Sequence, residues 1–342
     1  MMAEFMDFDE FTARFSTEEA CEEALFAVRW PNGFRCPRCN CSRAYPIRSR
    51  KLYQCADCHY QASLIAGTVF EHSRTPLSKW FIAIYMMSRA TGISAVALQK
   101  ILKVTYKTAW TMLMKLRCAM GRKEDADILR GMVKLNPVVY GAKIKSALNY
   151  CDPGEHPVML CAETSEEGVP EKIKIKCVPD DYLDRYRYVL RNQAYRYFQS
   201  RYVEPESSVE VFSMSRRRYF MELSVIVKQA EKWVYSTFIA IGRKHLQKYL
   251  DEYCFRFNTE VEYRTIMCQK YNFMRSYRSR FASDRAFAWW SSHATPWPAD
   301  VASFRLFESI LTVAVSVPAM TYRTIVQNPR EVGLTLHRFP AA

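Results

Sequence analysis

Two pairs of cysteines near the N-terminus constrain this chain more than any other feature. Two residues separate Cys36 from Cys39 and Cys55 from Cys58, and fifteen residues lie between the pairs. This spacing lets both thiolates of a pair reach one ion, and two pairs complete a tetrahedral S₄ site that suits Zn²⁺. Because such a site has no open position, we predict a structural zinc ion within a ribbon over residues 34–65.

Alternatives to this zinc site are four unrelated buried cysteines or a redox pair. Cys41 and His59 lie close enough in the sequence to substitute as ligands, although we expect both to be bystanders. Six basic residues crowd the same segment and are candidates for phosphate contacts: Arg35, Arg38, Arg43, Arg48, Arg50 and Lys51.

Composition favours a globular protein of a reducing compartment that binds a polyanion. The 342 residues carry a formal net charge of +14, which favours nucleic acid first and an anionic membrane surface second. The acidic first ten residues have the wrong sign for a signal peptide, and the apolar run 310–320 is shorter than the ~20 residues that span a bilayer. We therefore expect a cytoplasmic protein with no membrane partner.

Hydrophobic periodicity separates a helical N-terminal part from a mixed C-terminal part. We predict helices at 9–30, from Pro76 to Gly92 and, as two short helices, over 94–118, followed by a charged linker at 121–127. Strands are predicted at 133–140, 158–161, 173–178 and 209–212, with a turn at 168–170, a helix at 181–202 and mostly helix over 219–275.

Residues 94–117 have the pattern of a helix-turn-helix. A first helix over 94–102 is joined by a tight connection at 103–105 to a second helix over 106–117, with Thr105 as its N-cap. In this motif the second helix enters the major groove of DNA with its N-terminal residues towards the bases. The candidates for base or phosphate contacts are Tyr106, Lys107 and Thr108, with Lys115 and Arg117 near the phosphate backbone. An ordinary helical hairpin is the alternative.

Several longer strings occur in one order along the chain: TEEAC at 17–21, RWPNGFRCPRC at 29–39, AGTVF at 66–70, KWFIAIY at 79–85, YKTAW at 106–110 and KHLQKYLDEYCFRFN at 244–258. With these strings the chain resembles bacterial insertion-sequence transposases of the Merlin-like, zinc-ribbon type. The resemblance implies double-stranded DNA such as transposon ends as the partner, a nucleoid-associated location, and a homo-oligomer as one option.

The resemblance also implies an RNase H-like α/β domain in which acidic residues hold two Mg²⁺ ions for DNA cleavage and joining. The predicted fold class is therefore α+β and multidomain, with a zinc ribbon and helix-turn-helix ahead of an RNase H-like domain. The predicted segments are an N-terminal helical segment at 1–33, the ribbon at 34–65, the helix-turn-helix region at 66–120, the RNase H-like domain at 130–275 and a helical tail at 276–342.

The positions of the catalytic acids depart from the family. Asn136 stands where the family has its first aspartate, Met214 where it has its second, and Ser224 at the third position. Mg²⁺ prefers charged oxygen ligands, and a thioether is a poor one. We therefore expect the fold to be kept and strand transfer to be lost, so that Mg²⁺ is a cofactor only if activity remains.

Two further basic segments are candidates for DNA contact. Arg216, Arg217 and Arg218 follow Met214, and a helix at 181–202 carries the interleaved residues Tyr186, Arg187, Tyr188, Arg191, Tyr195, Arg196 and Tyr197. For that helix, an amphipathic surface with outward arginines and half-buried tyrosines is the alternative.

Three functions stay open on the sequence alone, and with them the question whether the chain is an enzyme. We favour a transposase-derived DNA-binding protein with a degenerate catalytic domain. An active transposase would need shifted acids, chosen among Glu163, Asp180, Asp181, Asp251 and Glu252, which otherwise are solvated charges or caps. A protein-interaction module held together by the zinc ribbon is the third option.

Overall fold

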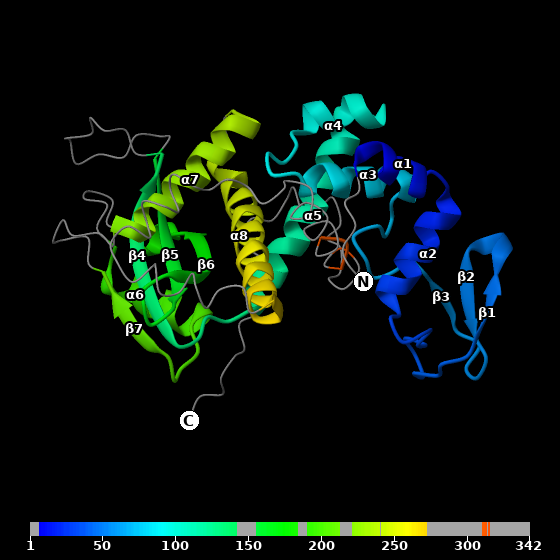
Figure 1. Cartoon of the computed structure of the whole chain (residues 1–342), viewed down its shortest axis with the longest axis horizontal. Coiled ribbons are helices and arrows are strands. Elements are labelled where there is room, and N and C mark those ends of the chain that lie inside the picture. The colour runs from blue at the N-terminus through cyan, green and yellow to red at the C-terminus, as the bar shows by residue number, and fades with distance from the viewer. Residues whose placement is uncertain are drawn as a thin grey trace. The chain divides into compact units, whose positions relative to one another are not determined.

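The computed structural model describes residues 7–141, 155–183, 190–212, 221–239, 241–271, 310–312 and 314 (Figure 1). The chain divides into two compact units. Of the described residues, the ribbon unit holds 14–83, 95–119, 311–312 and 314, and the sheet unit holds 7–13, 84–94, 120–141, 155–183, 190–212, 221–239, 241–271 and 310. Most of the predicted tail at 276–342 lies outside the described residues.

A three-stranded antiparallel sheet forms the centre of the ribbon unit. Its strands, in the order β1-β2-β3, are Ala44–Ile47, Leu52–Cys55 and Gln61–Ser63. On one face of the sheet, Tyr53 packs its ring against the rings of Phe26, Trp30 and Phe34 at centroid distances of 5.1, 5.6 and 6.1 Å. This aromatic cluster attaches the sheet to helix α2, which lies beside it in Figure 1.

The prediction of one helix over 9–30 is wrong, because two helices, α1 (Phe8–Arg14) and α2 (Glu18–Arg29), occupy this stretch. Thr17 separates them as the N-cap of α2, with its hydroxyl accepting from the backbone N–H of Ala20 at 3.2 Å. The Glu18 carboxylate then accepts from the backbone N–H groups of Leu77 and Ser78, both at 2.9 Å. It thereby caps the start of α3 (Leu77–Ser88) directly after Pro76, where a helix start was predicted.

The two predicted short helices over 94–118 are α4 (Ala95–Leu102) and α5 (Tyr106–Ala126), and α5 is much longer than predicted. The prediction of a charged linker at 121–127 is therefore wrong. Gly121 lies inside this helix. A larger residue would not fit there, because a Cβ at this position would stand 2.7 Å from Oδ2 of Asp251. The glycine serves close packing here, and the charged residues after it continue the helix.

A mixed four-stranded sheet forms the centre of the sheet unit, in the order β6-β5-β4-β7. All four predicted strands are present, as β4 (Met132–Tyr140), β5 (His156–Thr164), β6 (Pro170–Cys177) and β7 (Ser208–Val211). The first three strands are antiparallel neighbours, and β7 pairs with β4 in parallel. The turn predicted at 168–170 contains Gly168, whose φ of +79° places it in the left-handed region.

Helices cover both faces of this sheet, namely α6 (Asn192–Tyr202), α7 (Met221–Phe238) and α8 (Arg243–Tyr271). Side chains of β5 alternate between the faces. Val158, Leu160 and Ala162 pack in one core with residues of α7 and α8, whereas Met159 and Cys161 pack in another with residues of α6. The unit thus has three layers, with the sheet buried between helices (Figure 1).

The predicted helix at 181–202 is shorter in the structure. Residues Asp180–Tyr182 form a 3₁₀ turn, and Leu183 pairs with Leu190 in an antiparallel bridge before α6 begins at Asn192. Residues 184–189 lie outside the described part of the chain. The predicted helix therefore begins too early, and its described residues before Asn192 are not α-helical as predicted.

Side chains on one face of α8 bond the outer backbone groups of strand β6. The Asn258 amide accepts from the Ile173 N–H at 2.8 Å and donates to its carbonyl at 3.0 Å. The Ile175 N–H donates to the Cys254 sulfur at 3.1 Å, and the Gln247 amide donates to the Ile175 carbonyl at 3.0 Å. The helix therefore satisfies an edge strand that would otherwise present unpaired groups.

Buried charges fix the last turns of α5 to β6 and α8. The Lys176 ammonium donates to Asp125 at 2.6 Å and to Asp251 at 2.7 Å. Burial alone would lower the pKa of Lys176, but these two carboxylates outweigh it and raise that pKa well above its usual value. Beside it, Lys174 donates to the backbone carbonyl of Glu124. Lys176 is thus paired with two carboxylates, whereas burial outweighs the neighbouring charges at Lys174 and lowers its pKa.

The two longest described helices are α5, with 21 residues, and α8, with 29. Both carry charged side chains along much of their length. Within the described ranges, no helix combines the length and the apolar character that a bilayer-spanning segment requires.

Replacing Gly121 by alanine tests the packing explanation for the helical glycine. Helix propensity alone would stabilise Gly121→Ala by about 1 kcal/mol. Because the new methyl group would press on Asp251, we expect instead a loss of roughly 1–3 kcal/mol in the free energy of unfolding, measured with urea. In an Asp251→Ala background the same substitution should cost nothing. A more stable Gly121→Ala single variant would contradict the packing account.

Candidate metal centre and nucleic-acid interface

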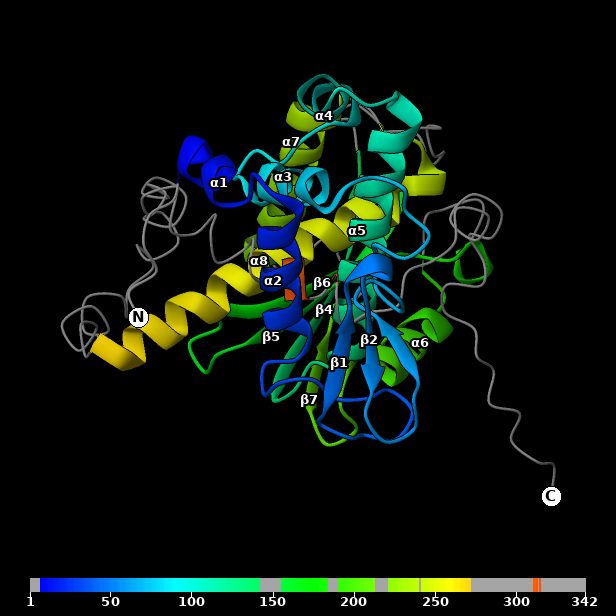
Figure 2. The ribbon, with the colours of Figure 1, turned by 90° about the vertical axis from the view of Figure 1, so that its right-hand side faces the viewer.

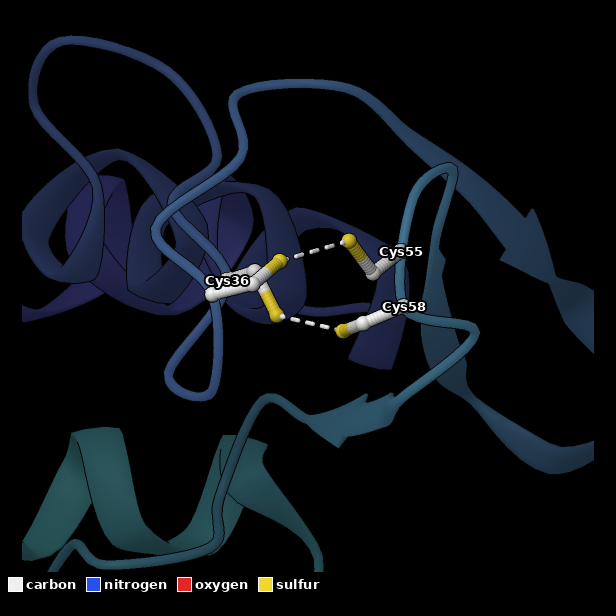
Figure 3. A group of neighbouring side chains, drawn as sticks. Cys36, Cys55 and Cys58 are labelled. Atoms are coloured by element: carbon white, nitrogen blue, oxygen red, sulfur yellow. Dashed lines mark hydrogen bonds between the residues drawn. The ribbon is translucent and has the colours of Figure 1, made fainter.

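The two cysteine pairs form two copies of one local structure. In each, the N–H of the first cysteine donates to the carbonyl five residues later, from Cys36 to Cys41 and from Cys55 to Tyr60, both at 2.9 Å. Each turn folds its pair back, and Figure 3 shows the sulfurs of Cys55 and Cys58 on the side of Cys36. Cys36 thereby meets Cys58, and Cys39 meets Cys55. The two-residue spacing within each cysteine pair therefore corresponds to one such turn.

The four sulfur atoms have the arrangement that a tetrahedral ion needs. All four lie within 4.8 Å of one another, with 3.6 Å between Cys36 and Cys58 and 3.4 Å between Cys39 and Cys55. Zn–S bonds of 2.3 Å require about 3.8 Å between sulfurs in a regular tetrahedron. The donor set and its spacing therefore fit Zn²⁺. Among the described residues, no second group of three or more cysteine, histidine or acidic side chains is arranged for a metal.

The environment of the thiols favours thiolates and also limits how many can form without a cation. The N–H groups of Cys58 and Asp57 outweigh burial and lower the pKa of Cys55 to about 6. At Cys39 the N–H of Cys41 acts in the same direction, but the neighbouring sulfurs outweigh it and raise the pKa to about 12. A bound divalent cation would remove this conflict between neighbouring thiolates.

Cys41 and His59, the two alternative ligands, do not belong to the four-sulfur group. The Cys41 sulfur accepts from the backbone N–H of Arg43 at 3.3 Å. His59 follows the second pair with a φ of +56°, and Asn40 follows the first pair with a φ of +62°. Asn40 and His59 thus each shape one of the two turns. That Cys41 and His59 are bystanders stays a prediction.

The surface of the ribbon is basic. Residues 34–65 contain six basic side chains and a single acidic one, Asp57. Asp57 pairs with Arg43 at 3.4 Å, and Lys51 pairs with Glu22 of α2 at 2.6 Å. Arg48 and Arg50 are exposed in the turn between β1 and β2. This turn presents positive charge to solvent at the end of the hairpin.

Helix α5 begins with the residues predicted to contact DNA. The predicted N-cap is present, because the Thr105 hydroxyl accepts from the Thr108 N–H at 3.2 Å. Lys103 has a φ of +51° in the tight connection after α4. Tyr106 is 52% exposed and Lys107 is exposed, whereas Thr108 is half-buried. The first turn of α5 is therefore accessible to a partner.

The prediction that Lys115 and Arg117 lie near the phosphate backbone of DNA is wrong, because both side chains are buried in the ribbon unit. The Lys115 ammonium donates to the carbonyls of Val69 at 3.1 Å and Glu71 at 2.8 Å. Burial lowers the pKa of Lys115, and Arg117 is only 1% exposed. Reaching a phosphate would require breaking this packing, so we assign Lys115 to holding the 69–71 segment on α5.

The structure brings together two of the three positions that the resemblance links to catalysis. Asn136 lies in the middle of β4 with no exposed surface, and Ser224 lies in the first turns of α7. The Asn136 amide donates to the Ser224 hydroxyl at 3.3 Å. Met214 lies in the stretch 213–220, outside the described residues. The two groups that meet are neutral, so they supply no negative charge to a divalent cation.

The acids proposed as shifted catalytic residues are mostly engaged elsewhere in the sheet unit. Four of them bond a backbone N–H or a cation, in the pairs Glu163–Arg130, Asp180–Arg243, Asp251–Lys176 and Glu252–Arg256. Asp181 lies in the 3₁₀ turn at 180–182. In the part of the chain that the structure describes, these acids form no cluster arranged for a metal.

The described part of the tyrosine- and arginine-rich segment follows the amphipathic alternative. Tyr197 stacks on Tyr182 with 5.0 Å between ring centroids, and it packs with Tyr195 against the core under α6. Arg196 between them is exposed. Arg191 is exposed at the N-cap position of α6. The other candidates of the two predicted basic segments lie outside the described residues: Tyr186, Arg187, Tyr188, Arg216, Arg217 and Arg218.

Comparison with known proteins supports the resemblance at the N-terminus. Residues 16–61, which include all four cysteines, match the family described as the transposase zinc-ribbon domain. A relative, described as an uncharacterized protein in transposable element ISH50 of Halobacterium salinarum, is 33% identical over 134 residues, 38% of this chain. The chain spans 45% of the length of that relative. No solved structure matches the chain. The chain thus has a transposase-type zinc ribbon, as predicted.

Removal of one ligand tests the metal centre, and Cys41 offers a matched control. We expect the wild-type protein to retain zinc at one ion per four-cysteine group after dialysis against a weak chelator. Cys55→Ser should lose that ion, because three thiolates and a hydroxyl bind zinc far more weakly. Cys41→Ser should keep it. Equal zinc loss in both variants, measured by atomic absorption, would exclude the four-sulfur assignment.

Proposed function

We propose that this protein is a transposase-derived DNA-binding protein of insertion-sequence origin that no longer performs strand transfer. The observation that carries the proposal is the four-sulfur group within a stretch that matches the transposase zinc-ribbon domain. In this proposal the ribbon unit binds double-stranded DNA, and Zn²⁺ holds the ribbon together without taking part in chemistry.

Charge and exposure support DNA as the partner of the ribbon unit. The chain has a formal net charge of +14, and the ribbon segment 34–65 contains six basic residues and one acidic residue. The exposed Tyr106 and Lys107 add a contact surface at the start of α5. A partner protein could also dock on these surfaces, but that alternative does not explain why the charge is so strongly of one sign.

The architecture of the sheet unit supports an RNase H-like domain as the finer proposal. The resemblance implies a mixed sheet flanked by helices. The described unit has three antiparallel strands, a parallel fourth strand beside the first, and helices on both faces. In such a domain, the centre of β4 and the start of α7 would carry metal-binding acids, and here they carry Asn136 and Ser224.

Loss of strand transfer follows from the chemistry of the ligands. Two Mg²⁺ ions in one site repel each other unless carboxylates compensate their charge. An asparagine oxygen and a serine hydroxyl are neutral, and the thioether of Met214 is a poor ligand for a hard cation. These substitutions therefore leave a protein that binds DNA without the metal pair that transposition needs.

The salt dependence of binding tests the DNA-binding part of the proposal. Association with a random-sequence duplex should weaken steeply with salt, because each neutralised phosphate contributes about 0.9 to the slope of log K against log salt. We expect the Arg48→Ala Arg50→Ala double variant to lower that slope by about 2. Lys172→Ala, which removes a partner of Asp127 in the sheet unit, is the control and should leave it unchanged. Binding without salt dependence would favour the protein-interaction module.

Restoring the acids tests the catalytic part. We expect Mg²⁺ to leave the melting temperature of the wild-type protein unchanged. The triple variant Asn136→Asp, Met214→Asp, Ser224→Glu should be stabilised by Mg²⁺, by about 2.7 kcal/mol at a hundred times its dissociation constant. Wild-type protein that is stabilised by Mg²⁺, or that cleaves DNA with it, would show that the acids lie elsewhere. A triple variant without response would remove this site from the sheet unit.

A further inference from the structure

Three polar side chains form a row across the ribbon sheet. The strand register places Tyr45 of β1 opposite Gln54 of β2, and Gln54 opposite Gln61 of β3. Directly opposed residues in antiparallel strands point to the same face with Cβ atoms about 4.5–5.5 Å apart. The row therefore extends over roughly 10 Å, twice the spacing between neighbouring strands.

This row lies on the face of the sheet that points away from α2. Successive side chains of a strand alternate between faces, and Tyr53, the neighbour of Gln54, packs into the aromatic cluster on α2. Tyr45 is 67% exposed and Gln61 is exposed, while Gln54 on the central strand is half-buried. Figure 2 shows β1 and β2 side by side at this end of the ribbon unit.

The two amides are available for a partner. Neither Gln54 nor Gln61 makes a side-chain hydrogen bond to another described residue, so each offers both a donor and an acceptor. Among the described residues of the ribbon unit, the Tyr45 ring beside these two amides is left 67% exposed. Such a face is suited to a partner whose surface presents a hydrogen-bond donor next to a hydrogen-bond acceptor.

The surrounding charge identifies that partner as a polyanion. Arg48 and Arg50 are exposed in the turn that ends the β1–β2 hairpin, and Arg43 is exposed at its other end. The major groove of B-DNA is about 12 Å wide and admits a two-stranded β-ribbon, with phosphates along both rims. The row of roughly 10 Å runs across the strands and fits within that width, while the basic residues lie along the strand direction at the two ends of the hairpin.

We propose that the outward face of the ribbon sheet contacts base edges in the major groove of double-stranded DNA. Gln54 and Gln61 are the base-contacting residues, because a glutamine amide pairs with the N6 and N7 atoms of adenine. Tyr45 packs beside them, and Arg48 and Arg50 contact the flanking phosphates. This inference rests on the proposed DNA-binding function and adds a sequence-discriminating surface to it.

Selection from a duplex pool with a randomised central segment tests the inference with the full-length zinc-loaded protein. Wild-type protein should enrich a sequence that contains adenine at the contacted positions. The Gln54→Ala Gln61→Ala variant should lose roughly 10- to 100-fold of the preference for that sequence over the unselected pool. Its zinc content, its affinity for the unselected pool and its salt slope should stay as in wild type. Gln199→Ala, an exposed glutamine of α6, is the matched control.

A second variant changes specificity instead of removing it. In Gln54→Glu the carboxylate accepts from the N4 amino group of cytosine and no longer pairs with adenine. The base enriched at one position should therefore change from adenine to cytosine. This outcome does not depend on how well the alanine variant folds, because glutamate has almost the shape of glutamine.

Each other outcome has a separate meaning. An identical preference in wild type and both glutamine variants would overturn the inference and leave base contacts to another element such as α5. Salt-dependent binding of the pool without any enriched sequence would also overturn it, yet leave the proposed DNA-binding function intact. Absence of binding to the pool would instead refute the proposed function, and the inference with it.

Discussion

The ribbon sheet depends on the four sulfur atoms that join its two cysteine turns. Within 34–65 the fully or nearly buried residues are few, and two of them are the ligands Cys36 and Cys55. With so little apolar burial, a bound zinc ion would supply a large part of the folding free energy, since zinc sites in small peptides contribute about 10–16 kcal/mol. The aromatic cluster around Tyr53 then joins this metal-held sheet to α2.

At the centre of the sheet unit, the cost of burying a charge determines which residues are tolerated. Asn136 has no exposed surface, and a carboxylate there would be costly to bury without a cation beside it. The neutral pair with Ser224 removes that cost while keeping a hydrogen bond between β4 and α7. Sites that collect acids for catalysis commonly lower the stability of the protein, so under the proposed function a neutral pair here would favour the fold at the expense of chemistry. A chain that is retained for DNA binding alone would benefit from this exchange.

Local patterns in the sequence predicted what local physics determines. The cysteine spacing predicts the four sulfurs that the structure brings together, alternation predicts four strands, and the residue type predicts Thr105 as a cap. One error is local, since Thr17 caps α2 through Ala20 and divides the helix predicted over 9–30. Other errors concern residues whose partners are distant in sequence. Gly121 resembled a helix end because Asp251, which excludes a side chain there, lies 130 residues later. Lys115 resembled a surface lysine because its acceptors belong to residues 69–71. The pair of Asn136 and Ser224 followed from the family resemblance and from no periodicity in the chain.

Helix α8 has a consequence for the ways in which the sheet can be extended. Its amides and Cys254 occupy the hydrogen-bonding groups on the outer side of β6. Strand addition from another chain is therefore blocked on that side unless the helix leaves. Within the described residues, β7 is the strand at the opposite border, and it is short and largely exposed. Among the described strands, a further strand could therefore be added beside β7 and not beside β6.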